Sequence, residues 1–426
     1  MDEASTPKPA RDRARYTALY PMWIALFVDV LGYSIFIPLF PFISDRFPGG
    51  SPIVVSFLLA TNAVFGLVFG PLLGSLSDKF GRKPLLMVSL AGTMTGFLVF
   101  AFAPSIEFLF LSRAIDGIFG GVYPITRAVI GDIVPIKNRS KQMANMGVVH
   151  IIASMGGPAA GGILAERTGT LLAPGLLAVV FALSALVITA AIFKETLPIK
   201  TGMYQGAPLQ RAETKAPSQL AQAGVGDVPL VKNKVALYIL AQWGFHSLYF
   251  MILVAMGGLY LGVHIGLNSE EIGLLMMLSS FIRIVVRYSA FVPILNKLGD
   301  HKTATFGLLL FALGFFWLIF VNNWIQYLIS LIVTSFAATC ARGPMNSFIS
   351  RSVSKYKQGR IQGIANSLEK VGEIIGPIIG GTVLALVGGA GYGLLLFSIS
   401  CIPFAMSFKK LVYPGEASIA LHEKPQ

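Results

Sequence analysis

Charged side chains are scarce in this 426-residue chain: Asp, Glu, Lys and Arg together make up 12% of it, whereas hydrophobic residues make up 54%. A soluble domain carries about 25% charged residues, so this sequence lacks the side chains for a water-facing surface of ordinary size. It contains instead many apolar runs of about 20 residues, each long enough to cross a bilayer as a helix. The composition therefore excludes an ordinary soluble protein and predicts an all-α integral membrane protein.

Cysteine and the motifs of common enzymes are also missing. The only two cysteines, Cys340 and Cys401, both lie in apolar runs, so no disulfide framework is predicted. No Walker A motif, zinc-ligand spacing, nucleophile elbow or dinucleotide fingerprint occurs in the sequence. These absences argue against an internal ATP motor and against an enzyme, and we expect neither a metal nor a cofactor.

Twelve apolar runs are predicted to span the membrane. They lie at residues 19–42, 53–75, 84–104, 107–131, 142–164, 170–193, 235–262, 271–293, 303–321, 326–348, 361–387 and 390–408. The first run follows a basic segment, as a signal peptide would, but it is too long for a signal sequence and contains Asp29. We therefore expect it to be retained as a span.

The formal net charge of +13 does not indicate nucleic-acid binding, because the 33 Lys and Arg residues follow the predicted loops. Only Arg46 and Arg167 fall in the loops after odd-numbered spans, whereas the termini and the other loops are rich in basic residues. This asymmetry is the positive-inside pattern, which predicts a multi-pass protein of the inner or plasma membrane with both termini in the cytoplasm.

The chain also repeats itself. A segment at 194–234, rich in Ala, Gln, Gly and Pro, is predicted to be a cytoplasmic linker between a six-helix bundle at 1–193 and a second one at 235–426. Each bundle carries the same Gly-Pro-x-x-Gly-Gly pattern in its fifth span. The helix-packing residues are Gly157, Pro158, Gly161 and Gly162 in one bundle and Gly376, Pro377, Gly380 and Gly381 in the other. Two pseudo-symmetric bundles around a central cavity are a transporter architecture.

The sequence resembles the major facilitator superfamily, and more narrowly its twelve-span drug:proton antiporter branch, over nearly the whole chain. The stretch GSLSDKFGRKP is similar to the signature between spans two and three, and DVLGYSIFIPLFP in span one and RAIDGIFGG in span four resemble further motifs. Two departures occur: Asp116 stands where the family usually has Gln, and Ala144 and Ala153 replace two glycines of the antiporter motif in span five. The resemblance implies a protein that works as a monomer.

The loop at residues 74–83 is interpreted as a conformational latch, formed by Gly74, Asp78, Gly81, Arg82, Asp132 and Arg127. An acid at the C-terminal end of span two opposes the helix dipole and needs a partner. The resemblance implies that Asp78 meets the N-terminal end of span eleven in the other bundle. Gly74 is expected to allow close helix approach and Gly81 a tight turn, and Arg82 is expected to reach Asp132. A plain positive-inside loop is the alternative, and Lys79 and Lys83 fit it.

Ionisable groups inside spans are functional candidates, because each costs about 2.5–3.5 kcal/mol even on the lenient insertion scale. The candidates for proton coupling or substrate binding are Asp29, Arg113, Asp116, Glu369, Glu373, Arg283, Arg342 and His246. Asp29 is expected near mid-membrane, either exchanging protons beside Arg113 or forming a permanent ion pair with it. Asp116 shares a helix face with Arg113 and could simply neutralise it.

Glu369 and Glu373 lie four residues apart on one predicted helix face, so two carboxylates there would repel each other and share a proton. Arg342 and Arg283 could instead neutralise them. His246 and His150 are candidate proton relays, although a lone histidine is more often a packing residue.

The leading hypothesis is a secondary active, proton-coupled antiporter that exports amphiphilic or hydrophobic small molecules by alternating access, driven by the proton gradient. Apart from the first residue of each span, the spans contain six basic and four acidic residues, a balance that also fits organic anions or acidic lipids. Uptake of a metabolite by symport and a non-transporting receptor on the same fold are weaker alternatives.

Overall fold

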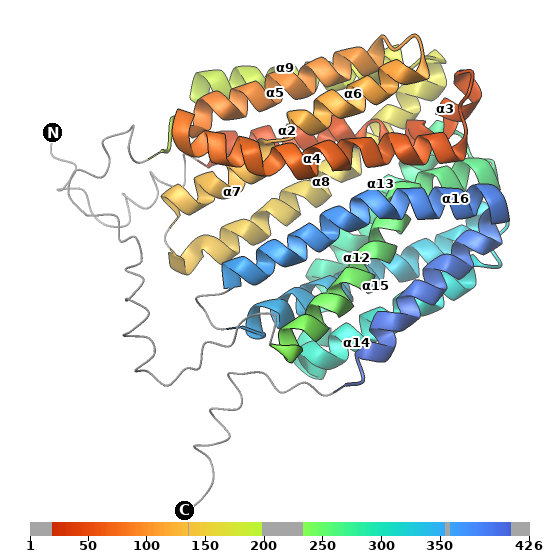
Figure 1. Cartoon of the computed structure of the whole chain (residues 1–426). Coiled ribbons are helices and arrows are strands. Elements are labelled where there is room, and N and C mark those ends of the chain that lie inside the picture. The colour runs from red at the N-terminus through yellow and green to blue at the C-terminus, as the bar shows by residue number, and fades with distance from the viewer. Residues whose placement is uncertain (1–18, 135, 198–232, 354–357, 410–426) are drawn as a thin grey trace, which may run out of the picture.

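The computed structural model describes residues 19–134, 136–197, 233–353 and 358–409, and within these it is helical throughout apart from short turns (Figure 1). The first half contains α2 (Tyr20–Ser34), η2 (Ile37–Leu39), α3 (Phe40–Arg46), α4 (Pro52–Phe80), α5 (Arg82–Ala101), α6 (Ile106–Ile118), α7 (Val122–Ile133), α8 (Ile136–Thr168) and α9 (Leu172–Ile192). The second half contains α12 (Lys234–Tyr260), η4 (Leu261–Ile265), α13 (Ser269–Val286), η5 (Arg287–Phe291), α14 (Val292–Leu318), α15 (Trp324–Arg351) and α16 (Gln358–Met406). Most of the predicted linker, residues 198–232, lies outside the described residues.

Ten helical stretches among the described residues are long and apolar enough to cross a membrane. Two of them run through a glycine with non-helical backbone, Gly299 (φ 74°) and Gly388 (φ 80°), and are long enough to cross twice. Positive φ is accessible to glycine without strain, so each helix reverses direction there. Eight single crossings and two double ones give the twelve spans of the predicted all-α membrane fold.

Local sequence explains where the long helices begin. Ser51, Asn233, Asn268 and Asn323 each accept a hydrogen bond from a backbone N–H in the first turn of α4, α12, α13 and α15. At Asn268 the cap is reciprocal, because Glu271 also accepts from the Asn268 backbone. The first turn of α13 is therefore firmly defined, which matters for the contacts described below.

Proline and glycine break two of the predicted spans. Span one changes from α2 to α3 through η2, which contains Pro38, and span four changes from α6 to α7 at Phe119–Gly121. A side chain added to Gly117 would lie 2.6 Å from the backbone oxygen of Asn62, so glycine is needed for α6 to cross α4 closely. These breaks and crossings place polar side chains inside the first half.

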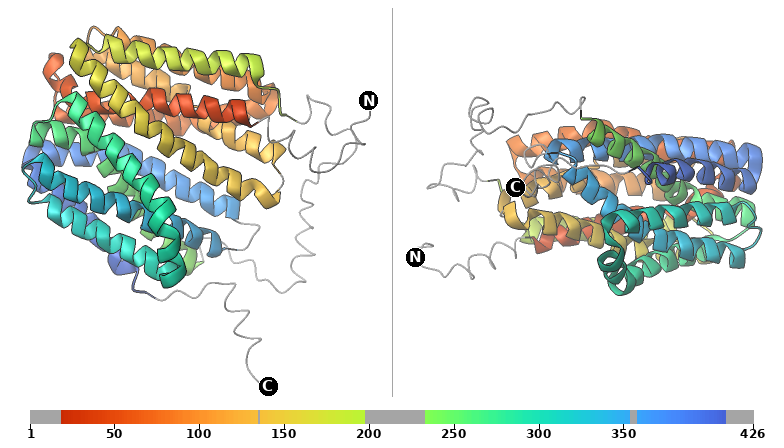
Figure 2. Two further views of the ribbon diagram at one scale, coloured as in Figure 1. Left: turned by 180° about the vertical axis from the view of Figure 1, so that it is seen from behind. Right: turned by 90° about the horizontal axis from the view of Figure 1, so that it is seen from below.

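The two halves contact each other through α8 with α13 and through α4 with α16. Their ribbons lie together at one end and diverge toward the end at which α7 ends and α16 begins (Figures 1 and 2). We call the first the closed end and the second the open end.

Glycine contacts at the closed end are too tight for any other residue. A Cβ on Gly162 of α8 would lie 2.8 Å from the Ser269 carbonyl carbon of α13, and a Cβ on Gly273 of α13 would lie 2.9 Å from the Pro158 carbonyl carbon of α8. A Cβ on Gly381 of α16 would lie 2.9 Å from the Ser56 side-chain Cβ of α4 and 3.2 Å from the Pro52 carbonyl oxygen. The halves therefore touch backbone to backbone between α8 and α13, and backbone to side chain between α16 and α4.

Glycines of the same two helices toward the open end have free space instead. A Cβ on Gly147 of α8 or on Gly363 of α16 would meet no atom within 4 Å. At these two positions the helices that meet the opposite half at the closed end have no close neighbour among the described residues. Together with the diverging ribbons, this indicates that the halves are separated at the open end.

Candidate functional site

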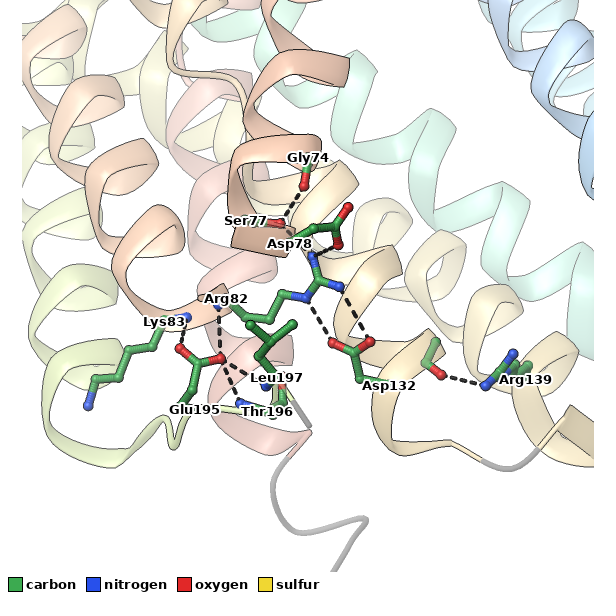
Figure 3. A network of polar contacts seen from close by, with 11 residues as sticks. Gly74, Ser77, Asp78, Arg82, Lys83, Asp132, Arg139, Glu195, Thr196 and Leu197 are labelled. Carbon is green, nitrogen blue, oxygen red and sulfur yellow. Dashed lines mark hydrogen bonds and ion pairs between the residues drawn. The ribbon is translucent and has the colours of Figure 1, made fainter. Parts of the chain in front are cut away.

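The loop between α4 and α5 carries a polar network at the open end (Figure 3). Arg82 is only 5% exposed; its Nε donates to Asp132 of α7 at 2.8 Å and its Nη1 contacts Asp78 at 2.6 Å. The guanidinium also donates to the Ser77 hydroxyl. The predicted contact between Arg82 and Asp132 is present. It links α4, α5 and α7, all of which belong to the first half.

Asp78 does not lie where the sequence-based interpretation placed it. Its carboxylate pairs with Arg82 four residues along the chain, it is 63% exposed, and no hydrogen bond or ion pair joins it to α16 in the described part of the chain. The physical reason is the separation of the halves at this end. Gly74 also differs from expectation, since a Cβ there would lie at an ordinary 3.8 Å from Pro124. Arg127 stacks on Tyr123 of its own helix, 4.8 Å from the ring centre.

Glu195, which the sequence analysis did not select, completes the network. Its carboxylate accepts four backbone N–H bonds, from Arg82 (2.9 Å), Lys83 (3.2 Å), Thr196 (3.0 Å) and Leu197 (2.9 Å). Two of these N–H groups belong to the first turn of α5, which carries the positive end of the helix dipole. Partial burial works to raise the pKa of Glu195, but the four N–H donors outweigh it and hold this pKa below its ordinary value.

Gly81 is required by the same arrangement. Its φ is 109°, which favours glycine, and an added Cβ would collide with the Glu195 carboxylate. The glycine thus serves the tight turn that the sequence predicted and also admits the acid that follows α9. The sequence does place an acid, Glu195, just after the sixth apolar run. It does not show that this acid lies against Gly81, which only the fold reveals.

Inside the first half, Arg113 and Asp116 of α6 form an ion pair at 3.3 Å. Arg113 is fully buried between Phe36 and Phe100, whose ring centres lie 5.2 and 5.4 Å from its guanidinium carbon. Asp116 also accepts from Asn62 of α4 at 2.9 Å. Of the two interpretations of Asp116, neutralisation of Arg113 is the one that the geometry supports.

Asp29 of α2 is therefore not the partner of Arg113. It is half-buried, and no hydrogen bond or ion pair to it is found among the described residues. Its carboxylate lies near enough to Asp116 for the two negative charges to interact. Tyr33, one turn further along α2, feels the charges of Arg113 in its own half and of Glu373 in the other. Asp29 and Tyr33 thus belong to the interior where the halves face each other.

In the second half each of the two glutamates of α16 is paired with a cation, and of the two interpretations the geometry supports neutralisation by Arg342 for Glu369. Glu369 accepts from Arg342 of α15 at 2.5 Å, and Glu373 pairs with Lys370 of its own helix at 2.5 Å. Each carboxylate has its own cation, so the expected repulsion is compensated. The Arg342 guanidinium also lies over Phe250, 4.5 Å from the ring centre, which fixes its orientation.

Arg283 of α13 has no such acidic partner. Its Nη2 donates to Ser280 at 3.0 Å, and no carboxylate lies within ion-pair distance of it in the ranges that the structure describes. The charge of Arg342 acts on it. Across the boundary between the halves, the exposed imidazole of His150 on α8 feels the charges of Arg283, Arg342 and Lys370. These groups form a cationic region in the interior.

His246, in contrast, belongs to the packed core. It is fully buried among Tyr249, Phe250 and Phe311, and its Nδ1 lies 2.5 Å from the Tyr249 hydroxyl. Its position in α12 is that of a packing histidine, and the geometry gives no support to a proton relay there.

The helix-packing residues sort into two groups by what they touch. Gly157 and Gly161 of α8 lie against Leu31, Ser34 and Ile35 of the first span, and Gly376 and Gly380 of α16 lie against Ile252 of α12. These contacts stay within a half. Gly162, Pro158 and Gly381 instead make the contacts across the halves. The two Gly-Pro-x-x-Gly-Gly segments therefore occupy equivalent positions in two similar bundles.

Comparison with known proteins agrees with this architecture. The family model described as Major Facilitator Superfamily matches residues 22–292 and 238–424. The "Tetracycline resistance protein, class H" of Pasteurella multocida is 24% identical over 83% of this chain and 85% of its own length, and the "Multidrug resistance protein 2" of Bacillus subtilis (strain 168) is 25% identical over 85% of this chain and 87% of its own length. The crystal structure of the human organic anion transporter MFSD10 (TETRAN) superposes with a TM-score of 0.67 at 21% identity, covering 94% of this chain and all of the other. The chain belongs to the Major Facilitator Superfamily.

Proposed function

We propose that this membrane transporter is a secondary active exporter that exchanges protons for amphiphilic small molecules by alternating access. Membership of the superfamily makes the chain a transporter of small molecules and not an enzyme. The tetracycline and multidrug resistance proteins that it resembles support export over uptake. Proton coupling and the substrate class are our inference from the interior of the molecule.

The proposal rests on the different packing at the two ends of the molecule and on the acid between them. The halves are in backbone contact at the closed end and separated at the open end, and an unpaired carboxylate, Asp29, lies between those ends. With the orientation that the basic loops favour, the open end faces the cytoplasm, and this conformation is inward-open. Separation of the α8–α13 and α4–α16 contacts would expose the same interior to the other side.

Asp29 is the acid that we propose to carry the proton. Asp116, Glu369 and Glu373 are each paired with a cation, so a proton on any of them would leave that cation without its partner. Protonation of Asp29 breaks no ion pair among the described residues. Asp29 is thus the carboxylate that gains and loses a proton at the lowest structural cost.

The loop network has a separate role in this proposal. Asp78 is held by Arg82 and exposed in the inward-open conformation, and it is free to meet the N-terminal end of α16 when the open end closes. It would then stabilise the outward-open state. It acts on the conformational equilibrium and does not contact substrate.

Proton flux in sealed proteoliposomes tests the proposal. Purified protein is challenged with a panel of cationic, neutral and anionic amphiphiles while internal pH is recorded, with Asp29→Asn and the exposed surface variant Glu107→Gln run beside the wild type. We expect substrate-evoked proton movement in the wild type and in Glu107→Gln, and its loss in Asp29→Asn. Substrate movement without proton flux in the wild type would refute proton coupling, and unchanged flux in Asp29→Asn would refute the role of this acid.

A further inference from the structure

The interior of the second half carries one positive charge more than its acids can balance. Three cations, Arg283, Arg342 and Lys370, face two carboxylates, Glu369 and Glu373, and each carboxylate is paired with one of the other two cations. Arg283 is left without an acid among the described residues. An unpaired cation within a membrane span is unfavourable unless a function or a bound partner compensates it.

The geometry around Arg283 leaves donor capacity for a ligand. Its Nη2 donates to Ser280, whereas its Nη1 makes no hydrogen bond in the described structure. The Nε atom is buried without a partner, but Nη1 is not among the buried atoms that lack one, so Nη1 is accessible. A guanidinium presents its N–H groups in a planar fork that matches a carboxylate. The free edge of Arg283 is therefore a ready anchor for an anion.

Neighbouring groups strengthen this region as an anion site. Arg342 lies near enough to Arg283 for the two positive charges to repel, and His150 on the opposite half is exposed and faces the same cations. An anion between these groups would relieve the repulsion. It would also be contacted from both halves, through α13 and α8. Asp29, the other unpaired group of the interior, interacts with Asp116 and does not supply the missing charge.

We propose that the transported molecule is an amphipathic organic anion whose carboxylate binds at Arg283, between Arg342 and His150. Its apolar part lies along the half-buried Phe250 of α12 and Tyr33 of α2, which border the same interior. This inference rests on the proposed transport function and adds the charge class of its substrate. A cationic amphiphile would meet the uncompensated positive charge of Arg283 and is disfavoured at this site.

Three probes with one naphthalene body and different charges test the assignment. Equilibrium binding of tritiated 1-naphthaleneacetate is measured on the full-length protein in lipid nanodiscs, with 1-naphthaleneacetamide and 1-naphthylmethylammonium as competitors. We expect the carboxylate to bind at least about tenfold more tightly than the amide, as loss of a charge-assisted hydrogen bond requires, and the ammonium ion to compete least.

Variants locate the binding position. Arg283→Gln should weaken binding of naphthaleneacetate by about 10- to 100-fold, and Arg283→Lys, which keeps the charge but not the fork, should weaken it less. Arg287→Gln removes an exposed arginine one turn further along and should leave affinity unchanged. The wild-type ranking of the three probes needs no variant to fold, so it stands as an independent measurement.

The outcomes separate this inference from the proposed function. Equal or tighter binding of the ammonium ion or the amide, no binding of naphthaleneacetate, or equal affinity in Arg283→Gln and the wild type would each overturn the anion assignment. If the ammonium ion or the amide binds as tightly as naphthaleneacetate or more tightly, proton flux evoked by that probe, and its loss in Asp29→Asn, would still support coupled export. Naphthaleneacetate binding that depends on Arg283, without any proton flux, would keep the anion site and refute the coupling.

Discussion

Replacement of Gly162 by alanine should shift the conformational equilibrium of the transporter. In the structure an added Cβ would lie 2.8 Å from the Ser269 carbonyl carbon and 3.3 Å from the Glu270 Cα, and closer still to the Ser269 oxygen. Ordinary contact begins at 3.4 Å, so α8 and α13 must separate by at least 3.4 − 2.8 = 0.6 Å at this point. The obstructing atoms are backbone in a capped first turn and cannot rotate away.

The magnitude follows from the cost of inserting a methyl group into a packed contact, which is about 1–3 kcal/mol. The contact joins the two halves at the closed end, so this cost falls on the conformation in which that end is sealed. A difference of that size changes the ratio of the two states by about 5- to 150-fold. Gly162→Ala should therefore favour opening of the closed end.

Gly147→Ala is the matched control, because Gly147 lies on the same helix with no atom within 4 Å of its added Cβ. Spin labels at Thr170→Cys and Asn322→Cys, both exposed at the closed end, report the distance between the halves after replacement of Cys340 and Cys401 by alanine. Longer distances should gain population in Gly162→Ala and not in Gly147→Ala. Equal distributions in both variants, or a shift of the same size in the control, would refute the reasoning.

Two further predictions concern the loop network. Glu195→Gln should speed amide hydrogen exchange at Arg82, Lys83, Thr196 and Leu197, because a neutral amide replaces the carboxylate that accepts all four bonds. The pKa of Glu195 is lowered in the fold. Protection of these amides by the wild-type carboxylate is therefore complete above the ordinary pKa of 4.5 and is lost as the pH falls through the lower folded pKa. After correction for intrinsic exchange, the Gln variant should lack this pH dependence. Asp132→Asn should lower the apparent melting temperature by an amount corresponding to ~3 kcal/mol, the low end of the cost of breaking a buried pair, because Asp78 and Ser77 still hold Arg82. Asp78→Asn should cost less than ~1 kcal/mol, since Asp78 is 63% exposed, and a larger loss for Asp78→Asn than for Asp132→Asn would contradict the assignment.

Features fixed by local sequence could be predicted well. Hydropathy and length gave the twelve crossings, since a bilayer demands about 20 apolar residues of each helix, and the helix reversals at Gly299 and Gly388 fall in the predicted gaps between spans. The contact of Arg82 with Asp132 was also predicted. Both residues belong to one half, and their neighbouring spans hold them at the same end in the conformation described.

Partners within the interior could not be assigned from sequence, because helical spacing does not say which neighbouring helix faces a side chain. Glu369 and Glu373 share a face as predicted, but Arg342 on α15 reaches one of them and Lys370 the other. His246 lies on a helix that is apolar on all sides, so its sequence could not distinguish the core from the interior surface. Glu195 is joined to Arg82 across 113 positions of sequence, and no local pattern records that distance.

Contacts between the halves are a different case, because they depend on the state of the molecule as well as on its sequence. The two glycine-rich segments show why. In α8, Gly161 packs on Ile35 of its own half and the next residue, Gly162, packs on Ser269 of the other; in α16, Gly380 and Gly381 divide in the same way between Ile252 and Ser56. Each helix thus packs on its own bundle by one face and on the opposite bundle by the adjacent face. The alternating access that we propose requires rigid halves that exchange contacts only at the second kind of face, and the repeated motif places both kinds of contact one residue apart in each half.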